Sequence, residues 1–154
     1  MGEQSCEFPL SNASDRQIDD ILSGSRTIAV VGLSDKADRD SHRVAAYLQT
    51  HGYRIVPVNP AAAVILGEKS YPDLASIPAD IAIDVVDVFR RPEFVPAVVD
   101  ASIARRARVV WMQLGIAHNA AAEKARGAGL AVVMDRCIKV EHARWVAAGG
   151  APRL

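Results

Sequence analysis

Five short apolar runs recur along the chain, separated by stretches in which apolar residues follow a helical spacing. Valine, isoleucine and alanine dominate these runs, a composition typical of strands that are buried on both faces. Strands alternating with helices predict a parallel sheet that is covered by helices on both sides. With right-handed crossovers this becomes a Rossmann-like, doubly wound α/β fold, whose mainly parallel five-stranded sheet has the expected order 3-2-1-4-5. The predicted strands cover residues 27–31, 54–58, 81–86, 109–112 and 130–134.

Capping and stop signals set the expected limits of the helices. Ser14 and Gln17 match a capping box that opens a first helix, which ends near Gly24. Pro57 lies inside the second predicted strand and cannot donate to a neighbouring strand, so this strand is expected to lie at an edge or a bulge. The stretch 61–78 fits short extended pieces or one short helix. The other helices are expected at residues 41–50, 92–104, 119–127 and 138–147.

The length of 154 residues fits a single domain. Residues 1–13 are expected to form a flexible N-terminal tail and residues 14–150 one domain, since neither a repeat nor a linker interrupts the pattern. Cys6 and Cys137 are too few for a disulfide framework, which favours a reducing compartment. No apolar run is long enough to span a membrane, and the acidic N-terminus lacks a signal segment. We therefore expect a soluble, cytoplasmic protein without a membrane partner.

Charge narrows the classes of partner. The 18 basic and 18 acidic residues cancel, which argues against nucleic acid as a partner because its binding proteins carry a basic excess or stripe. Most of the basic residues are arginines, whose planar guanidinium binds phosphate as a fork. Arg105, Arg106 and Arg108 are expected on the far side of the domain as solvated surface. Five other arginines follow predicted strands, at the edge where this fold binds ligands: Arg39, Arg43, Arg90, Arg91 and Arg136.

The loop after the first strand is one candidate ligand segment. Gly32 permits a close turn, Ser34 offers a hydroxyl and an amide, and Ser41 lies at the start of the next helix, where free amides favour an anion. A solvated turn is the alternative, but a loop of about ten residues in a compact domain favours a binding loop. Charge-assisted donors in the same loop are Lys36, Arg39 and Arg43.

The segment Phe89-Arg90-Arg91-Pro92, after the third strand, is the second candidate. An aromatic ring and two guanidiniums can sandwich an adenine ring and clamp a phosphate. Two cations at a helix start oppose the helix dipole by roughly 0.3–1 kcal/mol each, which hints at a compensating anion. The alternative places Phe89 in the core and the two arginines on a solvated helix start.

A dinucleotide site of the NAD type is disfavoured. Its fingerprint needs three glycines, and only Gly32 is present, with Ser34 and Ala37 at the other two positions. The second strand ends in Asn59 and Pro60 and offers no acid for the ribose hydroxyls. A P-loop is excluded as well, because no Gly-Lys-Ser/Thr motif follows.

These segments resemble the small stand-alone CoA-binding proteins that are related to the N-terminal domain of the succinyl-CoA synthetase alpha subunit. The resemblance spans about residues 26 to 144. Its most specific runs are 87–92 and 111–115, and the others are 30–34, 53–60, 67–69 and 134–139. It implies a Rossmann-like sheet that holds coenzyme A by its adenosine diphosphate end. It does not extend to ligase activity, because no phosphohistidine segment or nucleotide-grasp domain is matched.

The resemblance also implies which residues contact the ligand. Residues 32–34, Ser41 and Arg43 would hold phosphates, and Asn59 and Pro60 would line the nucleotide crevice. Residues 88–91 would enclose the adenine and the ribose phosphate. Asp40 departs from the family pattern and brings a negative charge towards the phosphates. The candidate cofactor-binding residues are Gly32, Leu33, Ser34, Arg39, Ser41, Arg43, Asn59, Pro60, Val88, Phe89, Arg90 and Arg91.

Neither a catalytic residue nor a metal ligand is expected. Cys137 and His142 are one conceivable nucleophile and base, but their spacing does not stack them on a regular helix, and a buried structural cysteine is favoured. His51 is expected to interact with the dipole at a helix C-terminus. His118 is expected to be solvated, just before an Asn119 helix cap.

The expected function is therefore binding of coenzyme A or an acyl-CoA, as a carrier, sensor or subunit without evident catalytic machinery, which makes an enzyme the less favoured class. One alternative is an enzyme, either a nucleotide-dependent oxidoreductase or a CoA-thioester-processing enzyme that uses Cys137. Another is an interaction module with a vestigial pocket. The expected partner is a small molecule, and the protein is expected to be a monomer or a small homo-oligomer.

Overall fold

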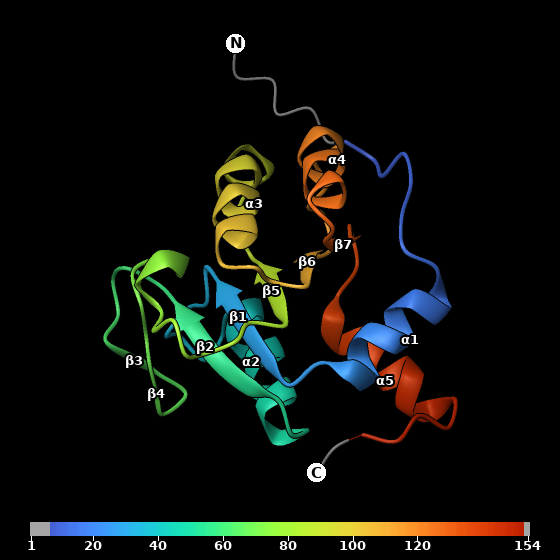
Figure 1. The fold of residues 1–154 in the computed structure, drawn as a ribbon. Helices are drawn as coiled ribbons and strands as arrows, with labels where there is room; N and C mark the ends of the chain where they lie inside the picture. The colour runs from blue at the N-terminus through green and yellow to red at the C-terminus, as the bar shows by residue number, and fades with distance from the viewer. Residues whose placement is uncertain (1–6, 153–154) are drawn as a thin grey trace.

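A computed structural model describes residues 7–152, which form an α/β domain around a parallel five-stranded sheet (Figure 1). The strands are continuous apolar segments, and almost all of their residues are buried, as expected for a sheet covered on both faces. A separate antiparallel pair, β3 (Val64–Ile65) and β4 (Glu68–Lys69), lies in the less regular stretch, as short extended pieces predict. The sheet consists of β1 (Thr27–Val31), β2 (Arg54–Val58), β5 (Val85–Val88), β6 (Val109–Met112) and β7 (Ala131–Val133).

Helices cover the sheet on both faces (Figure 1). One face packs against α3 (Val95–Ala104) and α4 (Asn119–Gly127), and the other against α1 (Asp15–Gly24), α2 (Asp40–Thr50) and α5 (Ile138–Ala147). Two short 3-10 helices complete the domain, η1 (Leu74–Ser76) and η2 (Pro92–Phe94). The predicted capping box is present, since Ser14 Oγ accepts from the Gln17 amide and the Gln17 side chain accepts from the Ser14 amide.

The strand order differs from the predicted one. The observed order is β2-β1-β5-β6-β7, so the third long strand lies beside the first and not outside the second. The order 3-2-1-4-5 was therefore wrong. The reason lies in β2, which among the strands of the sheet pairs with β1 alone, while on its outer side the Pro57 carbonyl accepts from the Tyr71 amide. A proline cannot donate to a second neighbour, and the edge position that it favours is incompatible with an internal β2.

Several element boundaries also differ from the predictions, among them the fifth strand, which covers Ala131–Val133, and α3, which begins at Val95 after the 3-10 turn. The third long strand covers Val85–Val88 and not residues 81–86, and just before it Asp84 Oδ2 accepts from the amides of Arg26 and Thr27. His118, expected to be solvated, is the N-cap of α4, and its Nδ1 accepts from the Ala121 amide.

The described part of the N-terminal segment lies along α4 and β7. The Leu10 amide donates to Asn119 Oδ1, and the Asn12 side chain exchanges two hydrogen bonds with the backbone of Met134. Cys6 and the rest of residues 1–6 lie outside the described residues. Within residues 7–152, none of the helices has the length and apolar character needed to cross a membrane.

Candidate functional site

The sheet reverses its winding between β1 and β5. The helix after β1, α2, packs on one face, whereas the helix after β5, α3, packs on the other. The two connections therefore diverge at the carboxyl ends of adjacent strands and leave a crevice, which is where open α/β sheets bind ligands. Gly32 and the segment 89–91 flank this crevice.

Gly32 is the point at which the two strand ends come closest. Its φ of 87° lies in the left-handed region, and a Cβ at this residue would lie 2.5 Å from the Phe89 carbonyl oxygen. The Gly32 amide donates to the Val58 carbonyl, and the Phe89 amide donates to the Val31 carbonyl. Both backbone conformation and space therefore require glycine, and the absent side chain leaves the floor of the crevice open.

Two cavities meet at Arg90, whose side chain lines both. The first, of about 500 Å³, lies on the α3 side, and we call it the α3-side cavity. The second, of about 680 Å³, lies at the start of α5, and we call it the α5-side cavity. Besides Arg90, the α3-side cavity is lined by residues such as Gly32, Val58, Asn59, Pro60, Leu74 and Phe94. The α5-side cavity is lined by residues such as Arg43, Phe89, Arg91, Gln113, Cys137 and Lys139.

Arg90 is held by an aromatic ring. Its guanidinium carbon lies 4.1 Å from the centroid of the Phe94 ring, and that of Arg91 lies 5.4 Å from it. Arg91 also pairs with Glu93, with Nε 3.1 Å from Oε1. The anion expected to compensate the charge of Arg91 at this helix start is therefore supplied by the protein itself. For Arg90, by contrast, the described residues supply neither an ion pair nor a hydrogen bond to the guanidinium. Arg90 is thus a positioned guanidinium that can take an external anion.

Phe94 was not among the predicted site residues. It is partly exposed and lies over the α3-side cavity, whereas the predicted aromatic residue, Phe89, packs partly against the core and lines the α5-side cavity. The 3-10 turn that begins at Pro92 carries Phe94 back towards Arg90. The proline after the two arginines indicates such a turn, but the contact between Arg90 and Phe94 depends on how the turn packs.

The loop after β1 is organised by its own hydrogen bonds. The Ser41 hydroxyl oxygen accepts from the Ser34 amide, and the Ser34 hydroxyl oxygen accepts from the Lys36 amide. Arg43, which was predicted to hold a phosphate, pairs with Asp40, the residue that departs from the family pattern. The Asp40 carboxylate therefore neutralises the charge of this guanidinium. Of this loop, Gly32 lines the α3-side cavity and Arg43 the α5-side cavity. Ser34, Arg39 and Ser41 line neither of the two cavities.

The remaining predicted residues divide between cavity and core. Asn59 and Pro60 line the α3-side cavity, and Asn59 Nδ2 donates to the Leu33 carbonyl at 2.8 Å, which ties the end of β2 to the loop. The side chains of Leu33 and Val88 are fully buried in the core. A ligand could therefore contact these two residues only through their backbone atoms.

The conceivable Cys137–His142 pair is not formed. His142 is fully buried, and its Nδ1 lies 2.9 Å from the Tyr47 hydroxyl. Burial, reinforced by His51, lowers the pKa of His142. The prediction of a buried cysteine was wrong, because Cys137 is partly exposed as the N-cap of α5 and lines the α5-side cavity. His51 contacts the Tyr47 carbonyl at the C-terminus of α2, as predicted.

Asp87 is a buried carboxyl group in the central strand beneath the crevice. It is fully buried within β5, between Val30 of β1 and Trp111 of β6, and neither of its oxygens has a hydrogen-bond partner among the described residues. Burial raises the pKa of Asp87 well above its ordinary value, because the ionised form loses its hydration there. It is not part of the lining of either cavity.

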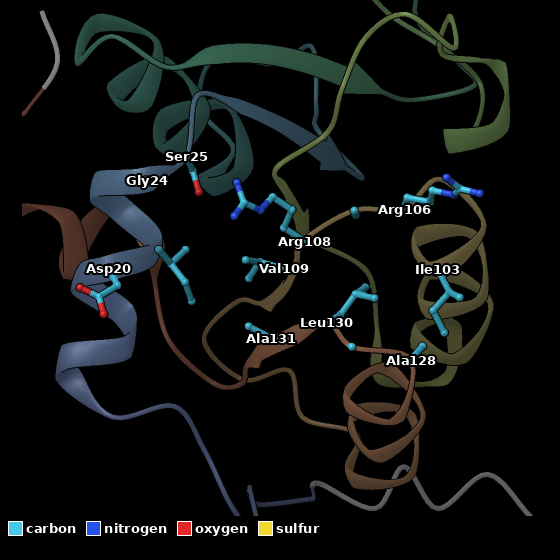
Figure 2. A pocket seen from close by; sticks show the side chains of 13 residues that line it. Asp20, Gly24, Ser25, Ile103, Arg106, Arg108, Val109, Ala128, Leu130 and Ala131 are labelled. Atoms are coloured by element: carbon cyan, nitrogen blue, oxygen red, sulfur yellow. The ribbon is translucent and has the colours of Figure 1, made fainter.

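A third hollow lies at the opposite end of the strands (Figure 2). Residues at the start of β6 and the end of α1 line it, and Figure 2 shows the side chain of Arg106 directed away from Asp20 and Ser25. Arg106 and Arg108 are exposed there, as predicted. Arg105 differs from the prediction, because it is partly buried and donates to the carbonyls of residues 74, 77, 78 and 81.

Comparisons with known proteins show the family and the fold of this chain. The family model described as "CoA binding domain" matches residues 26–143. The uncharacterized protein YneT of Bacillus subtilis is 44% identical over 134 residues, which cover 87% of this chain and 98% of YneT. A hypothetical protein from Pyrococcus horikoshii is 39% identical, with a TM-score of 0.84 over 91% of this chain and 97% of that protein. Acetyl-coenzyme A synthetase 1 of Ca. Korarchaeum cryptofilum, at 20% identity, shares the fold, with a TM-score of 0.65 over 77% of this chain and 28% of the synthetase.

Proposed function

The chain belongs to the CoA binding domain family, and we propose that it binds coenzyme A in the crevice between β1 and β5. The observation that carries this proposal is Arg90, a guanidinium that is stacked on Phe94, has no anionic partner among the described residues and lines two adjoining cavities. A ligand with phosphates at its middle and different groups at its two ends suits such a site.

The α3-side cavity suits the adenosine end of coenzyme A. Its walls are largely apolar, with Val58, Leu74 and Phe94 among them, and the mouth carries the polar side chains of Asn59 and Arg90. Adenine stacks on aromatic and aliphatic side chains, and phosphates bind guanidiniums. We therefore assign the adenosine to this cavity and the diphosphate to Arg90 and the open floor above Gly32.

The role that fits the described side chains is a non-catalytic one, as a carrier, sensor or subunit. Among residues 7–152, no group of three or more histidines, cysteines or carboxylates could hold a metal. His142 is buried against Tyr47 and not paired with Cys137. Enzymatic processing of a CoA thioester by Cys137 is the alternative. Its supporting observation is the partial exposure of this thiol in the α5-side cavity.

Titration calorimetry of the full chain tests the proposal directly. Coenzyme A should bind, and dephospho-CoA should bind more weakly if the ribose phosphate contacts an arginine. NAD and NADP should not compete. Ligand at about 100 times its dissociation constant should also raise the free energy of unfolding by about 2.7 kcal/mol. If coenzyme A and its thioesters neither bind nor stabilise the protein, the proposed function is wrong, and tight binding of NAD would favour an oxidoreductase.

A further inference from the structure

The α5-side cavity extends beyond the arginines to a group of apolar side chains. From Arg90, at the end of β5, its lining continues to the loop after β6 and to the first turn of α5. The first turn of α5 shares this cavity with the start of α2, since Asp40, Arg43 and Val44 also line it. Leu114 and Ile116 come from the loop after β6 and Val140 from the first turn of α5.

Two of these side chains are strongly exposed although they are apolar. Leu114 is 72% exposed and Val140 is 59% exposed. Single exposed apolar residues are ordinary on protein surfaces and need no explanation. Here two of them, together with the partly buried Ile116, line one cavity, and apolar groups gathered at the end of a cavity indicate a ligand-binding surface.

The cavity is lined by both charged and apolar side chains. Its cations come from Arg43, Arg90, Arg91 and Lys139, and its exposed apolar surface comes mainly from Leu114, Ile116 and Val140. With the adenosine in the α3-side cavity and the diphosphate at Arg90, the α5-side cavity is the continuous path for the rest of the ligand. The free thiol at the end of coenzyme A offers little apolar surface for Leu114 and Val140 to cover. A short hydrocarbon chain on that sulfur does.

We propose that the preferred ligand of this site is an acyl thioester of coenzyme A whose short, apolar acyl chain is held by Leu114, Ile116 and Val140. The proposal rests on the proposed function and adds to it the class of ligand. A branched or straight chain of a few carbons suits a shallow surface formed by three aliphatic side chains. A carboxylate at the end of the chain would gain nothing from these three side chains, and its partners in the cavity would be the cations Arg43 and Lys139.

Calorimetric titration of the full chain with CoA, acetyl-CoA, butyryl-CoA and succinyl-CoA tests the proposal. Each methylene that becomes buried should strengthen binding by about a factor of two to four. Butyryl-CoA should therefore bind about tenfold more tightly than CoA. Tighter binding of succinyl-CoA than of butyryl-CoA would assign the far part of the cavity to the cations Arg43 and Lys139 and would overturn the proposal. Equal affinities for CoA and butyryl-CoA would overturn the proposal and leave this apolar surface to a protein partner.

A double variant ties the effect to the surface. Leu114→Ser combined with Val140→Ser should reduce the ratio of the two dissociation constants, CoA over butyryl-CoA, to nearly one. Val64→Ser is the matched control, because Val64 is 61% exposed but lies on β3, outside both cavities. An unchanged ratio in the double variant would also overturn the proposal. If none of the four compounds binds, the proposed function itself fails, whereas binding of CoA without a gain from the acyl chain refutes only this inference.

Discussion

The carbonyl oxygen of Phe89 lies 2.5 Å from the position that a Cβ on Gly32 would occupy. The contact joins the ends of two adjacent strands, and their backbones can approach this closely only because one of the residues has no side chain. Arg90 is drawn into the same junction, since its Cδ lies 3.1 Å from that Cβ position. The close approach of the two strand ends at Gly32 therefore also places the Arg90 guanidinium beside the crevice.

Gly32→Ala should weaken both the fold and the site. The methyl group would meet the Phe89 carbonyl, which is backbone and cannot move aside cheaply, and alanine is strained at a φ of 87°. We expect a loss of about 2 to 5 kcal/mol in the free energy of unfolding, measured by urea denaturation. Gly67→Ala is a control for the backbone term alone, because its φ is also positive but its Cβ position is free of neighbours. Equal losses in the two variants would contradict the close approach as the cause.

Arg90→Ala should reduce the affinity for coenzyme A while leaving the unliganded protein nearly as stable. A charge-assisted hydrogen bond is worth about 1.5–3 kcal/mol, so the dissociation constant should rise about 10- to 150-fold. The stacking on Phe94 is worth at most about 1 kcal/mol at a partly exposed position, which limits the effect on folding. Arg108→Ala, an exposed arginine at the opposite end of the sheet, should leave the affinity unchanged. The same loss in both variants would indicate a general effect of charge.

Asp87→Asn should stabilise the protein at neutral pH. The pKa of Asp87 is higher in the folded state than in the unfolded state. The contribution of this carboxyl group to stability is therefore fully present below the unfolded pKa of about 3.9. It is lost as the pH rises towards the folded pKa. Asparagine does not titrate and avoids this loss. We expect a gain of about 1–3 kcal/mol at pH 7 that shrinks as the pH falls to about 4, measured by urea unfolding across pH.

The exposed residue Asp80 provides the control for this measurement. Asp80→Asn should change the free energy of unfolding by less than about 0.5 kcal/mol at either pH. A gain at Asp87 that does not depend on pH would show that ionisation of this carboxyl group is not the cause.

Arg105→Ala should release the segment between residues 74 and 81 from α3. The guanidinium donates to four backbone carbonyls, and its loss would leave them to water or unpaired. We expect about 2–3 kcal/mol less stability and faster amide exchange at Ile77. Because Leu74 lines the α3-side cavity, the affinity for coenzyme A should fall as well. Unchanged exchange at Ile77 would contradict this role of Arg105.

Most elements of the fold could be predicted because their signals are local. The capping box at Ser14 and Gln17, the apolar strands and the final helix at residues 138–147 all depend on neighbours in sequence. The strand order could not be read in the same way, since it depends on which strands pair across long connections. Pro57 carried the one local indication of that order, and an edge position for β2 follows from it.

The candidate site was predicted in part, for the same reason. Gly32, Asn59 and Arg90 follow strands, and the ends of parallel strands meet at one edge, so their gathering follows from the fold class. The stacking of Arg90 on Phe94 depends on the exact conformation of the turn at Pro92–Phe94, which the proline indicates only roughly. The exposure of Cys137 depends on packing between segments and carries no sequence signal of its own.

The sequence by itself thus determined the elements, the parallel sheet and the edge that carries the arginines, because each depends on hydrophobic period, turn residues and chain direction. Only the tertiary structure decided the strand order, the two cavities that meet at Arg90 and the exposure of Cys137. These features arise from contacts between segments, and their free energies depend on distance and burial. The pairs Arg43–Asp40 and Arg91–Glu93 join residues that are close in sequence, but the pairing became visible only in the structure. Among the arginines that line the two cavities, Arg90 is thus the one for which the described residues supply no ion pair, whereas Arg43 and Arg91 pair with Asp40 and Glu93.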